Sequence, residues 1–156
     1  MSRRDQIQLT DDEIRDFVRA NKTIIINSID PSGYPHPMPM WFAMDDDGAI
    51  RMTTFRKSQK VKNIERDPRV SLLVEDGEEY AQLRGVVFYG KAEVLDDIAA
   101  VTQTLLAIGG QEMPTDPEAR KTLEAGMART ASKRVCILIR PERVVSWDHR
   151  KLGGGY

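Results

Sequence analysis

The sequence is poor in the residues that build disulfides and metal centres. Its 156 residues include one cysteine, Cys136, and two histidines, His36 and His149. A single cysteine excludes an internal disulfide, which fits a reducing, cytoplasmic setting. Neither histidine has a neighbour at metal-ligand spacing, so we predict no zinc or iron site.

The chain also lacks long apolar runs and an excess of one charge. No stretch approaches the roughly 20 apolar residues of a membrane-spanning helix, and the N-terminus lacks the apolar segment of a signal peptide. With 23 basic and 24 acidic residues, the net charge of −1 argues against a dedicated nucleic-acid binder. We expect one globular domain over residues 1–156 that binds neither membranes nor nucleic acids.

Sequence motifs of several enzyme classes are missing too. The chain contains no G-x-S-x-G of the hydrolases, no P-loop and no G-x-G-x-x-G of the dinucleotide-binding folds. If the protein is an enzyme, a bound cofactor carries the reaction, and no side chain is assigned as catalytic.

What the sequence does contain is an alternation of strand and helix signals. Thr10 and Glu13 form a capping box that begins a helix ending near Asn21. Further helices are predicted over 58–66, after Asp96 as N-cap, and from Thr115 onward. Strands are predicted over 23–29, 34–44, 51–55, 69–75, 80–95 and 133–146, the last interrupted by Pro141. Six strands with flanking helices indicate a mainly β, α+β protein.

The strand over 34–44 has an unusual pattern. Pro35, Pro37 and Pro39 share one parity, so one edge of this strand lacks backbone N–H donors. Met38 and Met40 belong to the other parity, which forms a soft apolar face. The pattern predicts an edge strand with a methionine-rich core face, or a proline edge that opens onto a ligand groove.

The stretch over 51–66 concentrates positive charge. It has six basic residues and one acidic residue in a chain of net charge −1. A strand here runs into a helix N-terminus, where free N–H groups and the helix dipole favour anions. Lys57, Ser58 and Lys60 could complete a cradle for a phosphate or carboxylate. The alternative is a solvated basic face on a short surface helix.

Taken together, these features resemble the pyridoxamine 5′-phosphate oxidase-like split β-barrel flavoproteins. The resemblance rests on Arg66-Asp67-Pro68-Arg69-Val70-Ser71-Leu72-Leu73 and on Gly90-Lys91-Ala92-Glu93. Within that family, the stretch 33–42 and the helix Lys60-Val61-Lys62-Asn63-Ile64 are similar to the branch that depends on the deazaflavin F420. The resemblance implies a split antiparallel β-barrel of about six strands with flanking helices, of the FMN-binding type. It also implies a homodimer with the cofactor in a groove between subunits.

The resemblance also implies a set of cofactor-binding residues. The cofactor ring would lie along Met38, Pro39, Met40 and Trp41. The phosphate would lie near Thr53, Thr54, Ser58 and Lys60, with Asn63 as a further candidate on the same helix. Arg56 and Lys57 would hold the acidic tail of F420.

Two departures from the flavin mononucleotide (FMN) oxidases favour F420. Those proteins commonly carry an arginine where this chain has Gln59, and a glutamine where it has Gly85. We therefore predict an oxidoreductase that transfers a hydride from reduced F420 to a small organic acceptor. The alternatives are an FMN-dependent oxidoreductase of the same fold and a non-catalytic protein that binds a flavin or tetrapyrrole.

Overall fold

The structure is a computed structural model that describes residues 2–153, and it is built on one curled antiparallel sheet. Its strands are β1 (Thr23–Ile29), β2 (Pro35–Trp41), β3 (Ala43–Met44), β4 (Ile50–Phe55), β5 (Arg69–Asp76), β6 (Arg84–Leu95) and β7 (Arg134–Asp148). The α-helices are α1 (Arg3–Gln6), α2 (Asp11–Ala20), α3 (Gln59–Arg66), α4 (Ile98–Ile108) and α5 (Pro117–Ala131). Two 3-10 turns, η1 (Tyr80–Gln82) and η2 (His149–Leu152), complete the described elements.

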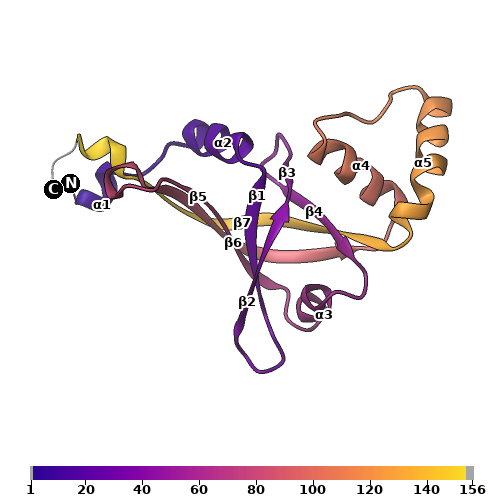
Figure 1. Cartoon of the computed structure of the whole chain (residues 1–156), viewed down its shortest axis with the longest axis horizontal. Helices are drawn as coiled ribbons and strands as arrows, with labels where there is room; N and C mark the ends of the chain where they lie inside the picture. Colours follow the sequence, from indigo (N-terminus) through magenta and orange to yellow (C-terminus); the bar gives the residue numbers. More distant parts are fainter. Residues whose placement is uncertain (1, 154–156) are drawn as a thin grey trace.

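The strand order is β2-β1-β5-β6-β7-β4-β3, and every pairing is antiparallel. The sheet curls into a half-barrel with helices around it, which confirms the predicted split-barrel fold (Figure 1). The described sheet has seven strands because the stretch predicted over 34–44 breaks at Phe42. The part before the break pairs with β1, and the part after it pairs with β4 at the opposite edge.

The main core lies on the inner face of the curl. Alternating side chains from the strands meet there, including Ile24, Leu72, Phe88 and Ile137, each at most 2% exposed. Helix α2 adds Phe17 and Val18, and α3 adds Ile64. Period-two alternation in the strands therefore matches the predicted core face.

Half of the outer face is covered by the α4–α5 pair. Cys136 of β7 points outward and packs against Val101 of α4 and Ala131 of α5. The Thr104 Oγ1 atom lies 3.3 Å from the Cys136 Sγ atom. Both helices lie together at one end of the molecule in Figure 1, far from α1 and η2. Burial raises the pKa of the Cys136 thiol, which is typical of a structural cysteine.

The other half of the outer face carries an apolar row outside both core clusters. The register places Ile25, Leu73, Val87 and Val145 side by side across β1, β5, β6 and β7. All four are partly exposed, and nearby Trp41 of β2 is 70% exposed. Contiguous exposed apolar surface of this kind is typical of protein–protein interaction sites.

Two predicted boundaries were wrong. The strand predicted from Tyr80 begins only at Arg84, because residues 80–82 form a 3-10 turn. The N-cap of α4 is Asp97, not Asp96, and its carboxylate accepts a hydrogen bond from the backbone N–H of Ala100 at 2.8 Å. The side chain of Asp96 pairs instead with Arg56.

Pro141 does not interrupt the last strand, contrary to the prediction. Strand β7 continues through it as one element of 15 residues. The register shifts from Gly90↔Pro141 to Tyr89↔Arg143, which leaves Glu142 as the extra residue of a β-bulge. A bulge tolerates proline because the local ladder of hydrogen bonds is already disrupted.

The segment after α1 and the segment around η2 are joined by hydrogen bonds. The backbone N–H of Asp148 donates to the carbonyl of Ile7 at 2.7 Å, and Lys151 Nζ donates to the carbonyl of Gln8 at 2.8 Å. Figure 1 shows α1 and η2 side by side at the end of the molecule opposite α5. None of the helices within residues 2–153 is long and apolar enough to cross a membrane.

Candidate cofactor-binding site

The N-terminus of α3 presents a compact polar cluster at the end of β4. The chain turns between them through a hydrogen bond from the Ser58 N–H to the Phe55 carbonyl at 3.0 Å. Lys60 Nζ donates to Thr54 Oγ1 at 2.9 Å, and Thr54 Oγ1 donates to Ser58 Oγ at 3.3 Å. Ser58 occupies the N-cap position, yet its side chain makes no capping hydrogen bond within the described chain. Of the first-turn N–H groups of α3, that of Val61 donates to the Ser58 carbonyl at 3.1 Å, and the two before it have no partner within the described chain, so these two can bind a ligand.

Lys60 is the residue of this cluster whose burial and lack of a carboxylate partner within the described chain most clearly indicate an anion-binding site. It is only 7% exposed, and no carboxylate within residues 2–153 forms an ion pair with it. Burial lowers the pKa of its ammonium group, because desolvation disfavours the charged form. A buried ammonium whose partner is a neutral hydroxyl is costly for the fold. An anion beside Lys60 would remove that cost, so the donor set fits a phosphate group.

The side-chain amide of Asn63 is hydrogen-bonded within the chain and holds α3 against β1. It is fully buried, and its Nδ2 atom donates to Ser28 Oγ of β1 at 3.0 Å. Its Oδ1 atom accepts from Gln59 Nε2 at 2.8 Å. Both sides of the amide are thus engaged within the chain. The structure therefore gives Asn63 a role in positioning the cradle helix against β1.

Thr53 and Thr54 point in opposite directions, as successive residues of a strand do. Thr54 faces inward toward Lys60. Thr53 lies on the outer face, directly across from Cys136 and beneath α4. The structure therefore does not bring Thr53 to the cluster that contains Thr54, Ser58 and Lys60.

The two residues expected to hold an acidic tail differ in their surroundings. The Arg56 guanidinium pairs with the Asp96 carboxylate and also donates to the Ser132 carbonyl at 3.2 Å. It thus ties the loop before α3 to both ends of the α4–α5 pair. Lys57 is exposed and makes no ion pair within the described residues. Only Lys57 of the two is free to meet a further anion without breaking an existing contact.

The four residues expected to line the cofactor ring divide between two faces of β2. Met38 and Met40 pack against the core on the inner face. Pro39 and Trp41 are exposed on the outer face. β2 is an edge strand, as predicted, and its side chains alternate. A flat ring could therefore contact only one of these pairs, together with the backbone of the free edge.

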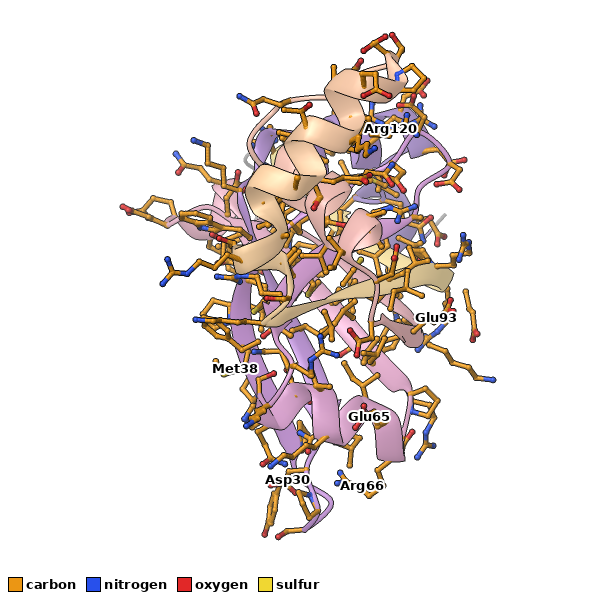
Figure 2. The ribbon with its side chains drawn as sticks, turned by 90° about the vertical axis from the view of Figure 1, so that its right-hand side faces the viewer. Asp30, Met38, Glu65, Arg66, Glu93 and Arg120 are labelled. Carbon is orange, nitrogen blue, oxygen red and sulfur yellow. The ribbon has the colours of Figure 1, made fainter. Side chains whose placement is uncertain are left out.

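A cleft of about 410 Å³ lies beside the cluster, between α3 and the ends of the central strands. Its lining is Arg56, Ile64, Glu65, Ala92, Val94, Asp96 and Val135. Val135 pairs directly with Thr54, which places the apolar floor of the cleft next to the Lys60 cluster. In Figure 2, Glu65 lies on the side of the molecule opposite Met38. No sequence motif marks Asp96 or Val94 as lining residues of this cleft, because they reach it only through strand register.

Trp147 fills the space beside Gly85. A Cβ atom at position 85 would lie 2.3 Å from Cζ2 of the Trp147 indole, well inside contact distance. The two residues are direct cross-strand partners of β6 and β7. No side chain, and so no glutamine, fits at position 85 unless Trp147 moves. Among residues 2–153, no group of three or more His, Cys, Asp or Glu side chains could hold a metal ion.

Comparison with known proteins identifies the family. The family model described as pyridoxamine 5′-phosphate oxidase matches residues 10–148. A crystal structure of the conserved hypothetical protein Rv2991 from Mycobacterium tuberculosis is 38% identical, with a TM-score of 0.82 over 100% of this chain and 95% of that one. No match was found among curated protein sequences.

Two more distant structures share the fold alone. One is named an F420 reductase, with 22% identity and a TM-score of 0.57 over 83% of this chain and 94% of that one. The other is an FAD-binding protein from Mesorhizobium loti, with 17% identity and a TM-score of 0.58 over 88% of this chain and 92% of that one. From the span of the family match and the shared split barrel, the chain belongs to the pyridoxamine 5′-phosphate oxidase family.

Proposed function

We propose that this chain is a cytoplasmic, homodimeric oxidoreductase that binds coenzyme F420 and passes a hydride from the reduced cofactor to a small organic acceptor. The observation that carries the proposal is the buried, uncompensated ammonium of Lys60 at the first turn of α3. Residues 1–156 would form its single cofactor-binding domain. The family contains oxidoreductases, and one structural neighbour is named an F420 reductase.

The residues of the cluster would anchor the phosphate of the cofactor. Lys60 would offer a charged donor, Ser58 a hydroxyl, and α3 the backbone N–H groups of its first two residues. When bound, F420 supplies the hydride chemistry. The protein then has to bind it, orient its ring along β2 and exclude water, so no side chain need act as a nucleophile.

Two features favour F420 over a flavin. The exposed Lys57 and Lys62 flank the cradle and make no ion pair within the described residues, so they suit an acidic tail that extends beyond the phosphate. The Trp147 indole occupies the place of the side chain that FMN oxidases commonly carry at position 85. A flavin would therefore lose one contact, whereas F420 would gain charge complementarity.

The uncovered outer face supports the proposed homodimer. The apolar row of Ile25, Leu73, Val87 and Val145 is contiguous and partly exposed, and Trp147 lies beside it. A second copy would bury this row in an isologous contact. The proline-bearing edge of β2 cannot accept a regular strand partner, so pairing of edges is a poorer route to a dimer. Light scattering should give twice the 17.7 kDa chain mass at micromolar concentration.

Cofactor binding tests the proposal directly. Fluorescence titration with F420 and with FMN should be made at low and at high salt. F420 should bind more tightly than FMN at low salt. The difference in affinity between the two cofactors should narrow at high salt, because screening weakens the contacts to the acidic tail of F420. If FMN binds more tightly at both salt concentrations, the proposed cofactor is FMN and not F420. If the purified protein shows a haem-like Soret band, the result favours a protein that carries a tetrapyrrole.

A further inference from the structure

The outer face carries a row of cations that the proposed cofactor site does not use. Arg69 lies directly opposite Lys91, and Lys91 lies directly opposite Arg140, on the neighbouring strands β5, β6 and β7. Directly opposed residues of an antiparallel pair share a face and lie within about 5.5 Å of each other at Cβ. Three positive side chains thus stand side by side across the sheet.

The β-bulge adds a fourth cation to the same face. In a regular strand, Arg140 and Arg143 would point to opposite faces, because they are separated by an odd number of residues. The extra residue at Glu142 restores Arg143 to the face of Arg140. The Arg143 guanidinium lies 3.8 Å from the centroid of the Tyr89 ring, which holds it in position.

A close backbone approach supports the bulge. A Cβ atom at Gly90 would lie 2.7 Å from the Arg140 carbonyl oxygen, so only glycine allows this contact. Bulges recur beside binding sites, where they redirect side chains. Here the redirected side chain is Arg143.

Most of this charge is not neutralised inside the chain. Within residues 2–153, Lys91, Arg140 and Arg143 make no ion pair, whereas Asp67 binds Arg69 at 2.6 Å. Glu93 borders the row on β6 without pairing to it, and Figure 2 shows it at the edge of the molecule. Like charges directly opposite each other destabilise a sheet. The row therefore costs stability in a chain of net charge −1, which points to a ligand rather than to folding.

We propose that the cationic row, defined as Arg69, Lys91, Arg140 and Arg143, binds a small ligand bearing two or more phosphate or carboxylate groups. The row spans three adjacent strands, or about 10 Å, which exceeds the size of a single anion. Arginine forks bind such oxygens in pairs. Ser71, opposite Tyr89 on the same face, adds a hydroxyl.

This site is separate from the Lys60 cluster. Lys60 lies on the inner face beside Thr54, whose cross-strand partner is Val135. The row lies on the outer face, between the apolar row and the part of the sheet that α4 and α5 cover. It would remain at the accessible rim if the apolar row were buried in a dimer.

The test uses inorganic tripolyphosphate and isothermal titration calorimetry on the Lys60→Ala protein, which removes the cradle as a competing site. The variant is Lys91→Ala/Arg140→Ala. The matched control is Lys121→Ala/Arg129→Ala, which removes two exposed cations from α5. We expect about tenfold weaker binding in the row variant, from two charged contacts of a surface site, and less than about threefold in the control.

Thermal unfolding shows whether the row variant is folded, and its melting temperature should not fall because opposed like charges are removed. An equal loss of tripolyphosphate affinity in the row variant and the control variant would overturn the proposal. The proposal would also fail if the Lys60→Ala protein did not bind tripolyphosphate. Tighter binding of a single-stranded oligonucleotide than of tripolyphosphate would overturn the assignment to a small ligand. Because no arm contains F420, the result stands whether or not the cofactor proposal holds.

Discussion

Two regions of the molecule differ in how their cations are paired. Around η1 and η2, three cations have carboxylate partners: Arg84 with Asp76, Arg150 with Asp148 and Lys151 with Glu13, all at 2.5–2.6 Å. At the start of α3, Lys60 is more deeply buried than any of these cations and has only a hydroxyl for a partner.

We infer that the paired cations stabilise the fold and that Lys60 serves the proposed binding site. A paired cation gains from its carboxylate and fastens one segment to another. An unpaired buried cation is a cost that folding alone does not explain, and binding of an anion can offset it. Each prediction below tests this contrast, beginning with the largest expected effect.

The Lys60→Met variant should lose cofactor affinity while remaining folded. Loss of a charged hydrogen bond to phosphate should weaken F420 binding by about 1.5–3 kcal/mol. Unfolding free energy should stay level or rise, because methionine fills the same space without a buried charge. Fluorescence titration and urea unfolding measure the two quantities, with Lys121→Met on α5 as the exposed control. A folded variant with unchanged affinity would remove Lys60 from the site.

The same site should respond to alkaline pH. Burial lowers the pKa of Lys60, so the folded protein releases this proton below the ordinary value of about 10.4. Between the lowered pKa of the folded protein and the ordinary pKa, the unfolded chain holds more protons on this group than the folded chain does. Deprotonation of Lys60 therefore makes folding more favourable as pH rises through this range. Anion binding should weaken over the same range, since the ammonium is lost. The Lys60→Met variant should lack this dependence, and an identical pH profile in both proteins would contradict the argument.

In the region of η1 and η2, Gly85→Gln should destabilise the fold. Any side chain at position 85 meets the Trp147 indole, so overpacking should cost about 1–3 kcal/mol. Urea unfolding gives the free energy, and tryptophan fluorescence reports displacement of the indole. The paired variant Gly85→Gln/Trp147→Ala should recover part of the loss by making room. If the single variant is as stable as the wild type, the contact does not restrict position 85.

Breaking a paired charge should affect stability and leave binding alone. The Asp148→Asn variant removes the partner of Arg150 but keeps an oxygen for the cap of η2, so we expect a loss of about 1–2 kcal/mol. Arg150 lowers the pKa of Asp148, so the stabilisation is present above the ordinary pKa of aspartate. This stabilisation disappears as pH falls through the lowered pKa of Asp148 in the folded protein. The unfolding free energies of the wild type and the variant should therefore become equal in acid. A change in F420 affinity would contradict the separation of the two regions.

The smallest effect is expected from the most exposed pair. The Glu13 carboxylate is 43% exposed, so the Lys151→Ala variant should lose no more than about 1 kcal/mol. Part of that loss would come from the Gln8 carbonyl, which also accepts from Lys151. Denaturation at high salt serves as the check, because screening should shrink the charge-dependent part. A salt-independent loss would assign the effect to the backbone contact instead.

Local chemistry determined most of the elements. The capping box of Thr10 and Glu13, the alternating Ile24 and Ile26, and the proline pattern of β2 each act within a few residues. The helices and strands they predict are therefore present, apart from boundaries such as Tyr80, where a 3-10 turn replaced strand. The family resemblance assigned a phosphate cradle to the start of α3 from a contiguous stretch of chain, and that assignment stays a prediction.

Only the tertiary structure decided which side chains meet. Neighbouring residues of a strand face opposite sides, so Thr53 and Thr54, and Met38 and Trp41, lie on different faces, and tertiary packing decided which face contacts the Lys60 cluster or the core. Asp96 reached Arg56, Trp147 reached Gly85, and the bulge at Glu142 turned Arg143 toward Lys91. These contacts depend on strand register across distant parts of the chain, and a shift of one residue reverses every side chain on a strand. The sequence by itself determined which groups are available to bind an anion, and the fold decided which of them lack a partner.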